Sequence, residues 1–168
     1  MKHVIKIILK KLFYLFFTLV PPKLFNRFIS LLNQLYTLWK INEFKKTSRN
    51  LYFQYPMYLH GGKFISIGEN FNCGLRFRLE AYDQHLGYVF KPEISIGNNV
   101  SINHDCHIGA INKIIIEDQV LIASKVFITD HYHGQTTLEG IRLPPSKRKL
   151  FSKGQVKIEK NVWIGEGV

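Results

Sequence analysis

Cysteine is scarce in this chain. Its 168 residues include only Cys73 and Cys106, and neither belongs to a Cys-x-x-Cys pair. A disulfide-rich secreted scaffold or a cysteine-ligated zinc ribbon needs more closely spaced cysteines, so both classes are excluded. Two reduced thiols in a cytosolic protein are expected instead. The length and the 46% apolar content suffice for one domain with a hydrophobic core.

Acidic residues are almost missing from the N-terminal segment. Residues 1–50 contain ten lysines and arginines and a single acid, Glu43, which gives a net charge of +9. Residues 51–168 contain thirteen basic and eleven acidic residues and are nearly neutral. No nucleic-acid-binding motif accompanies the basic segment, so we expect no nucleic-acid partner. The excess charge must be explained within residues 1–50.

Long hydrophobic runs are also missing. The run Leu12–Val20 has nine residues, Thr18 included, whereas a membrane-spanning helix needs about 20. The segment instead predicts two helices broken at Pro21-Pro22. In the first helix, the basic residues fall on one side and the apolar residues on the other. In the second, over residues 24–44, apolar residues recur at helical spacing among scattered lysines and arginines.

Three interpretations of these helices remain open. A cationic amphipathic helix can lie in the interface of an anionic membrane, and this peripheral contact is our prediction. Alternatively, the helices pack on their own domain or on a neighbouring subunit. A signal peptide fits the basic start but not the Pro-Pro pair or the missing small-x-small cleavage site. We therefore divide the chain into a basic helical segment, residues 1–50, and a second domain, residues 51–168.

A period of six residues governs the sequence from residue 64. Isoleucines occur at positions 96, 102, 108 and 114 and, after a shift of two, at 116, 122 and 128. This period fits neither a helix nor simple strand alternation. It predicts a solenoid with three flat faces, one hexapeptide on each, in which the aliphatic residues point inward and stack. Glycine and asparagine at positions 97–99 suit corners with positive φ.

Residues 64–168 resemble the hexapeptide-repeat acyltransferases. The motifs that carry the resemblance are "IGNNVSINHDCHIGA", "VLIASKVFITDHYHG", "PPSKRKLFSKGQVKI" and "NVWIGEGV". They are most similar to the branch that acetylates sugars of O-antigen, capsule and exopolysaccharide, itself similar to maltose and galactoside acetyltransferases. The resemblance implies a mainly β fold, a left-handed parallel β-helix. It also implies a homotrimer, acetyl-CoA as acyl donor and a sugar or lipid-linked glycan as acceptor. We expect the protein on the cytoplasmic face of the inner membrane.

The stretch "ITDHYHG" interrupts the hexads with titratable residues. A sugar hydroxyl attacks a thioester poorly until its proton is removed, and histidine is the side chain best suited to that task. By resemblance, His131 is the catalytic base, and His133 is the weaker candidate because it lies two residues farther into the loop. Asp130 is expected at the substrate site, where it can orient the imidazole. A turn residue is the ordinary alternative.

Other site residues are implied by the resemblance alone. Asn103 corresponds to the asparagine that positions the acceptor hydroxyl, with a corner asparagine in left-handed geometry as an equal alternative. Trp163 and Gly165 are expected at the coenzyme groove, although Trp163 can also simply cover the edge of the core. The loop 132–155 should protrude from the solenoid. Its lysines and Arg148 could meet phosphates of coenzyme A or of a lipid-diphosphate carrier, or could be solvated.

Two alternatives to an acetyltransferase are kept. His104, His107, His131 and His133 suggest a zinc enzyme similar to the gamma-type carbonic anhydrases, but the HxxH and HxH spacings do not match that class, and no metal is expected. The second alternative is a truncated, non-catalytic protein. The sequence stops at Val168 within a hexad, so C-terminal coils that cap the solenoid and complete the coenzyme groove are expected to be missing.

Overall fold

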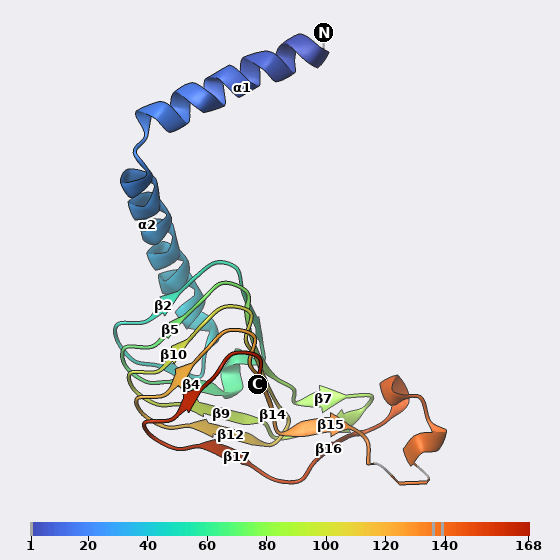
Figure 1. The fold of residues 1–168 in the computed structure, drawn as a ribbon. Helices are drawn as coiled ribbons and strands as arrows, with labels where there is room; N and C mark the ends of the chain where they lie inside the picture. The colour runs from blue at the N-terminus through green and yellow to red at the C-terminus, as the bar shows by residue number, and fades with distance from the viewer. Residues whose placement is uncertain (1, 136, 139) are drawn as a thin grey trace.

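A computed structural model describes residues 2–135, 137–138 and 140–168. Three parallel sheets surround one core (Figure 1). Each of the first four turns of the chain adds one strand to each sheet, and the last described turn adds one strand to the first and second sheets. The first sheet, β1-β4-β9-β12-β17, consists of Lys46–Thr47, Ile65–Ile67, Glu93–Ile96, Lys113–Ile116 and Val156–Ile158. The second, β2-β5-β10-β13-β18, consists of Tyr52–Phe53, Asn72–Cys73, Ser101–Ile102, Leu121–Ile122 and Trp163–Ile164. The third, β3-β6-β11-β14, consists of Met57–His60, Phe77–Ala81, His107–Ala110 and Phe127–Thr129.

This arrangement is the left-handed parallel β-helix that the six-residue period predicts. Ile102 of β10 pairs with Ile122 of β13, and Ile108 of β11 pairs with Ile128 of β14. All four are buried. The two-residue shift also has a structural reason. Strands of the first sheet are long enough to place two alternate residues inward, such as the isoleucines at 114 and 116 of β12, so a turn of the helix gains two residues there.

The isoleucine stack should dominate the stability of the solenoid. Ile114 is fully buried and is paired with Ile94 on one side and Val156 on the other. We expect Ile114→Ala to lower the free energy of unfolding by about 2–5 kcal/mol, because a cavity remains inside a close-packed core. Ile115→Ala is a matched control, since this neighbour on β12 points outward. Urea denaturation of both variants checks the prediction, and equal losses would contradict it.

Asparagines with positive φ turn one corner of the coils. Asn50, Asn70 and Asn99 lie one above the other, with φ values of 59°, 56° and 56°. The side-chain amide of Asn50 donates to Asn70 Oδ1 at 3.0 Å, and that of Asn70 donates to Asn99 Oδ1 at 2.9 Å. The adjacent Gly97 serves a different purpose, because a Cβ there would lie 2.8 Å from the backbone of Glu117. Gln119 continues this column in the following turn with a φ of 60°. Polar residues therefore adopt positive φ at this corner, and the glycine permits close approach between turns.

The solenoid begins earlier than the sequence period indicates. The first turn, β1 to β3, starts at Lys46 and contributes Phe53 and Met57 to the core. Its strands pair in parallel register with those of the second turn, for example Met57 with Phe77. The hexad pattern is hidden there because aromatic residues and methionine replace the inward isoleucines.

Helix α2 closes the N-terminal end of the solenoid. α1 (Lys2–Leu19) and α2 (Pro22–Lys40) are separated at the proline pair as expected, and η1 (Ile41–Glu43) leads into the first strand. The side chains of α2 that are buried are polar, among them Asn33 and Thr37. Thr37 Oγ1 accepts from the Phe53 backbone N–H at 2.9 Å, and Asn33 Oδ1 accepts from that of Tyr55 at 3.1 Å. The polar face of α2 thus accepts hydrogen bonds from backbone N–H groups at the open edge of the second sheet.

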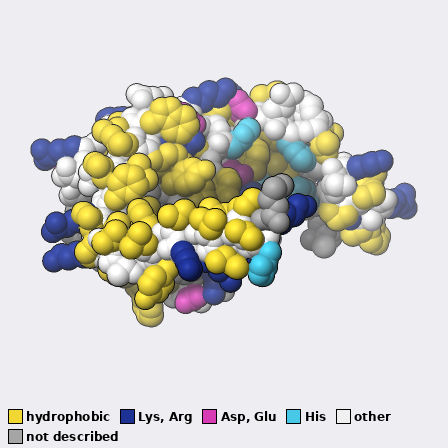
Figure 2. All heavy atoms as spheres, turned by 90° about the horizontal axis from the view of Figure 1, so that it is seen from above, with side chains coloured by type: hydrophobic (Ala, Val, Ile, Leu, Met, Phe, Trp, Pro, Cys, Tyr) yellow, Lys and Arg dark blue, Asp and Glu magenta, His cyan; other side chains and the backbone are white. Residues whose placement is uncertain are grey.

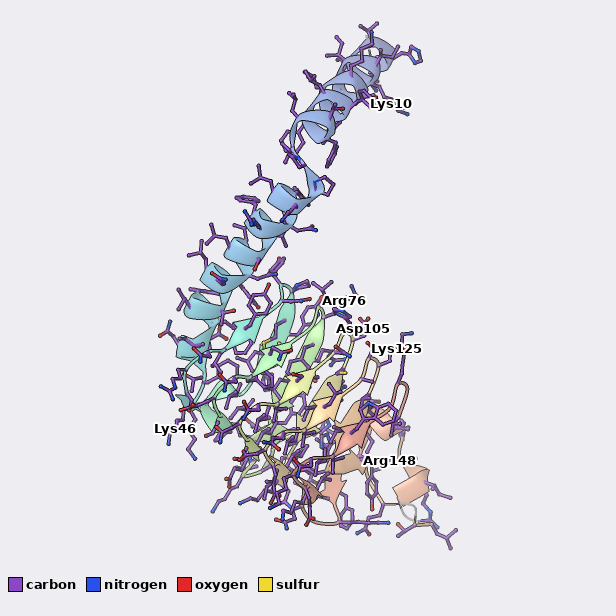
Figure 3. All side chains as sticks on the ribbon, turned by 60° about the vertical axis from the view of Figure 1, so that its left-hand side comes forward. Lys10, Lys46, Arg76, Asp105, Lys125 and Arg148 are labelled. Carbon is purple, nitrogen blue, oxygen red and sulfur yellow. The ribbon has the colours of Figure 1, made fainter. Side chains whose placement is uncertain are left out.

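The apolar residues of both helices face outward. Seen from the helix end, hydrophobic side chains gather over the helices, with lysines and arginines around them (Figure 2). Every described residue of α1 is exposed, and Lys10 projects from it (Figure 3). On α2, Phe28 and Leu35 are both 55% exposed, and Trp39 is 63% exposed. An amphipathic helix ordinarily buries its apolar side, so this pair of helices offers an apolar surface that the chain itself does not cover.

Two antiparallel hairpins leave the solenoid on the same side (Figure 1). The first consists of β7 (Gln84–His85) and β8 (Tyr88–Val89), and the second of β15 (His131–His133) and β16 (Leu150–Ser152). The short helices η3 (Gly140–Arg142) and η4 (Pro145–Lys147) lie between β15 and β16, and η2 (Gly62–Phe64) precedes β4. Both cysteines are free and buried in the core.

Candidate active site

A cavity of about 530 Å³ lies between the outer face of the third sheet and the two hairpins. It is lined by residues of β6, β11 and β14 together with His85, Tyr132, His133 and Leu150 of the hairpins. The sheet contributes two columns of outward side chains at matching register. Arg78, His107 and Phe127 form one column. In the other, Glu80, Gly109 and Thr129 follow one another.

His131 enters this cavity where β14 ends and β15 begins. Its Nδ1 lies 3.0 Å from Asp130 Oδ1 and 3.0 Å from Thr129 Oγ1. An imidazole nitrogen that faces a carboxylate carries the proton, which leaves the lone pair on Nε2. Among the described residues, no hydrogen-bond partner occupies that Nε2. The ring is therefore held at one nitrogen and free to accept a proton at the other.

Asp130 is built into the fold rather than exposed on the loop. Its side chain is fully buried, and its two oxygens accept the backbone N–H groups of Ile111 at 3.0 Å and Asn112 at 2.8 Å. Burial by itself would raise the pKa of Asp130, but the hydrogen bonds from His131 and the two backbone groups outweigh it and hold the pKa below its ordinary value. An ionised carboxylate thus orients the His131 ring.

Replacing this carboxylate by an amide should cost stability. Asp130→Asn turns an –NH₂ group toward donors that need an acceptor, so we expect a loss of about 1–3 kcal/mol in the free energy of unfolding at neutral pH. Because the folded-state pKa is depressed, the wild-type advantage is present above the unfolded pKa of about 4 and fades as the pH falls below it. Urea titrations at pH 7 and pH 3.5 measure both effects.

Asp83→Asn is the control for that prediction, because Asp83 forms an exposed ion pair with Lys63. Such a pair contributes about 0–1 kcal/mol. A loss for Asp130→Asn no greater than for Asp83→Asn would contradict the structural role of Asp130.

The structure brings His131 and Asp130 together and places His133 at the cavity, but it leaves Asn103, Trp163 and Gly165 outside. Asn103 is exposed at the corner after β10, where its backbone N–H donates to Ile122 at 2.9 Å. Trp163, 71% exposed, lies on β18 of the second sheet, and Gly165 follows it. A different sheet therefore carries Trp163 and Gly165, away from the third sheet that precedes His131.

The basic loop residues lie beside the cavity rather than in it. Lys147, Arg148 and Lys149 line a separate hollow of about 360 Å³ with Tyr88 of the first hairpin. Lys149 Nζ lies 4.7 Å from the centre of the Tyr88 ring, and Lys153 Nζ lies 5.9 Å from that of Tyr132. These cations pack on aromatic rings of the hairpins.

The four histidines that suggested a zinc site have separate partners. His104 Nδ1 accepts from the backbone N–H of Leu75 at 3.0 Å, while His107 Nε2 lies 2.7 Å from Glu80 Oε2. The His133 ring lies 5.8 Å from that of His85. Within the described part of the chain, no three His, Cys, Asp or Glu side chains converge as metal ligands do. The side-chain placement does not favour the zinc alternative.

Sequence reasoning missed the polar residues of β6. Arg78 and Glu80 line the cavity, and Tyr82 follows them on the same side of the strand. The signal was present in "FRLEA", where Phe77, Leu79 and Ala81 alternate with charged residues. Gly109 also lines the cavity and carries no side chain into it.

The sequence is similar to that of a curated bacterial protein. The chain is 38% identical over 119 residues to "Putative lipopolysaccharide biosynthesis O-acetyl transferase WbbJ" of Escherichia coli (strain K12), an alignment that covers 68% of this chain. Its hexapeptide repeats and its parallel β-helix are those of the hexapeptide-repeat acyltransferases, which it resembles. No family model matches it, and no solved structure does.

The similarity to WbbJ does not extend over the whole of that relative. This hexapeptide-repeat chain spans 57% of the length of WbbJ. The resemblance and the β-helix agree, since the parallel sheets with stacked isoleucines are the structure that hexapeptide repeats encode.

Proposed function

We propose that the chain is an O-acetyltransferase that transfers an acetyl group from acetyl-CoA to a sugar hydroxyl during the biosynthesis of a cell-surface polysaccharide. The observation that carries this proposal is the Asp130–His131 pair, with Nδ1 held by a buried carboxylate and Nε2 open to the cavity. The name of the E. coli relative supports the reaction class and the lipopolysaccharide pathway.

The proposed reaction requires the protein to remove the proton of the acceptor hydroxyl and to return it to the leaving thiolate. His131 Nε2 takes the proton of the acceptor hydroxyl as the oxygen attacks the thioester carbonyl carbon. A C–O bond forms, the C–S bond breaks, and His131 returns the proton to the departing thiolate. Asp130 stabilises the imidazolium that exists between these two transfers. The proton, the acetyl group and the thiol are thereby all accounted for without a further reactant.

A homotrimer is part of this proposal. Asn103, Trp163 and Gly165 lie outside the cavity of their own chain, on a corner or on another sheet. If they serve the same reaction, a neighbouring copy must bring them to the cavity of His131. Sedimentation equilibrium is expected to give the mass of three chains.

Peripheral attachment to the cytoplasmic face of the inner membrane is also proposed. Among the described residues, no helix is long and apolar enough to cross a bilayer. The apolar faces of α1 and α2 are exposed, and α1 carries Lys2, Lys6, Lys10 and Lys11. Cationic helices with an uncovered apolar side bind anionic membrane surfaces. This position would bring the cavity close to a lipid-linked glycan.

The proposed reaction is tested by release of free thiol from acetyl-CoA. Purified full-length protein is mixed with acetyl-CoA and methyl glycosides of glucose, galactose and rhamnose, and with lipid-linked oligosaccharide extracted from bacterial membranes. Acceptor-dependent thiol release, with an added acetyl mass on the sugar, is expected. Thiol release that never depends on an acceptor would refute the proposal.

A further inference from the structure

A second carboxylate–imidazole pair faces the same cavity as His131. His107 Nε2 lies 2.7 Å from Glu80 Oε2, and Arg78 Nη2 donates to both oxygens of Glu80, at 2.9 and 3.1 Å. The side chains of Glu80 and His107 are 13% and 27% exposed, so the cluster is largely shielded from solvent. Neither the hexad pattern nor the proton transfer by His131 requires these three residues.

The charge states of this pair can be assigned. Burial would raise the pKa of Glu80, but hydrogen bonds from Tyr82 and Arg78 outweigh it and lower the pKa. Burial, followed by the nearby Arg78 charge, lowers the pKa of His107. At neutral pH the pair is thus a carboxylate and a neutral imidazole, in which Nε2 donates to Glu80 and Nδ1 keeps a lone pair. Burial and the Glu80 carboxylate also raise the pKa of Tyr82 to about 12, so its hydroxyl stays protonated.

Gly109 leaves an open space between the two imidazoles. A Cβ placed on Gly109 would lie 3.4 Å from His107 Nε2 and 3.6 Å from His131 Cε1. Both rings therefore border the same small volume. Gly109 is also paired directly with Glu80 on β6 and with Thr129 on β14. Because glycine has no side chain, the space between the Glu80 cluster and His131 stays open at this position. A small polar group that enters this space meets both pairs.

The chemistry of the space fits hydroxyl groups better than an anion. Arg78 is neutralised by Glu80, so the cluster has little net charge to attract a phosphate. Arg78 supplies donors, and His107 retains an acceptor at Nδ1 because its Nε2 is bonded to Glu80. Phe127, 57% exposed, packs its ring 5.0 Å from that of His107 and adds an apolar surface. A sugar, with hydroxyls around an apolar ring face, presents the complementary pattern.

We propose that Arg78, Glu80 and His107 form the acceptor subsite, which hydrogen-bonds a hydroxyl adjacent to the one deprotonated by His131. This rests on the proposed acetyl transfer and names its substrate as a glycoside with two neighbouring free hydroxyls. Arg78 and His107 contact the sugar, and Glu80 positions both. β6 and β11 lie between β14 and the helix end of the solenoid, the side from which a lipid-linked glycan would enter.

The test compares Glu80→Gln with Asp105→Asn. Asp105 pairs with Arg76 through two contacts, much as Glu80 pairs with Arg78, but this pair lies on a corner outside the cavity (Figure 3). Both variants remove one charge from an arginine pair. With a methyl glycoside as acceptor, Glu80→Gln is expected to raise the acceptor KM at least 10-fold and to leave the KM for acetyl-CoA within twofold of wild type. Asp105→Asn should change neither constant.

His107 provides a second, independent variant. His107→Phe keeps the ring shape but loses the acceptor, whereas His107→Gln retains a polar side chain with an acceptor oxygen. We expect the phenylalanine variant to repeat the rise in acceptor KM and the glutamine variant to recover most of it. A purely structural role would instead lower kcat and raise both KM values together, which would overturn the proposal.

Saturation-transfer NMR with the same methyl glycosides separates this inference from the proposed function. If wild-type protein binds a glycoside and Glu80→Gln does not, the subsite is supported even if acetyl transfer is undetected. Equal binding by wild type and Glu80→Gln, or no binding of any glycoside by wild type, would overturn it.

Discussion

His131→Ala is expected to abolish acetyl transfer and leave the fold intact. The base contributes about 10²- to 10⁴-fold in rate, so kcat should fall by at least 100-fold. The solenoid should survive because Asp130, which the ring contacts, keeps its two hydrogen bonds from Ile111 and Asn112. Thiol-release kinetics give the rate, and urea denaturation confirms that the variant is folded.

His133→Ala is the matched control for the loss of the base. His133 lies on the same strand and borders the same cavity, but its side chain is exposed and its ring faces His85 rather than a carboxylate. We expect its kcat to remain within a few-fold of wild type. An unchanged kcat in His131→Ala, or an equal loss in both variants, would show that the Asp130–His131 pair is not the base.

Deleting residues 2–20 is expected to release the protein from anionic vesicles. This deletion removes α1 with its four lysines and leaves α2, which must stay because Asn33 and Thr37 hydrogen-bond the edge of the second sheet. A second variant keeps α1 but replaces its four lysines by glutamine. Each lysine near an anionic surface contributes about 1 kcal/mol to binding, so this variant should bind the vesicles about 10³-fold more weakly. Flotation with vesicles of phosphatidylglycerol and phosphatidylcholine measures the bound fraction.

The control for this prediction removes four lysine charges from the solenoid instead of from α1. Lys113, Lys125, Lys157 and Lys160 lie on the β-helix, far along the chain from α1, and their replacement by glutamine should leave flotation unchanged. A deletion that floats as well as wild type would refute membrane attachment through α1. A deletion that instead changes the oligomeric mass would assign the apolar face to a second copy of the chain.

Much of the fold could be read from residue types because the β-helix repeats one local rule. Each inward isoleucine stacks on its counterpart in the next turn, so the period of six appears directly in the sequence. The first turn escaped notice because Phe53 and Met57 fill the same inward positions without the isoleucine signature. The break between the helices was also predictable, since proline cannot continue a helix.

The site could be predicted only in part. His131 and Asp130 are adjacent in the chain and lie in the stretch that interrupts the hexads, so they could be identified from the local sequence. Glu80 and His107 are 27 residues apart, and they meet because parallel register places β6 beside β11. Which outward residues share a cavity depends on how many residues each turn contains, and the hairpin at β7–β8 changes that number.

The sequence by itself determined the class of fold, the helix break and the histidine that interrupts the hexads, because each is encoded by residues close together in the chain. Only the tertiary structure decided that α2 turns its polar side to the domain, and that Glu80 and His107 lie across Gly109 from His131. Both depend on partners from distant segments: open backbone groups at a sheet edge in one case, and strands stacked in register in the other.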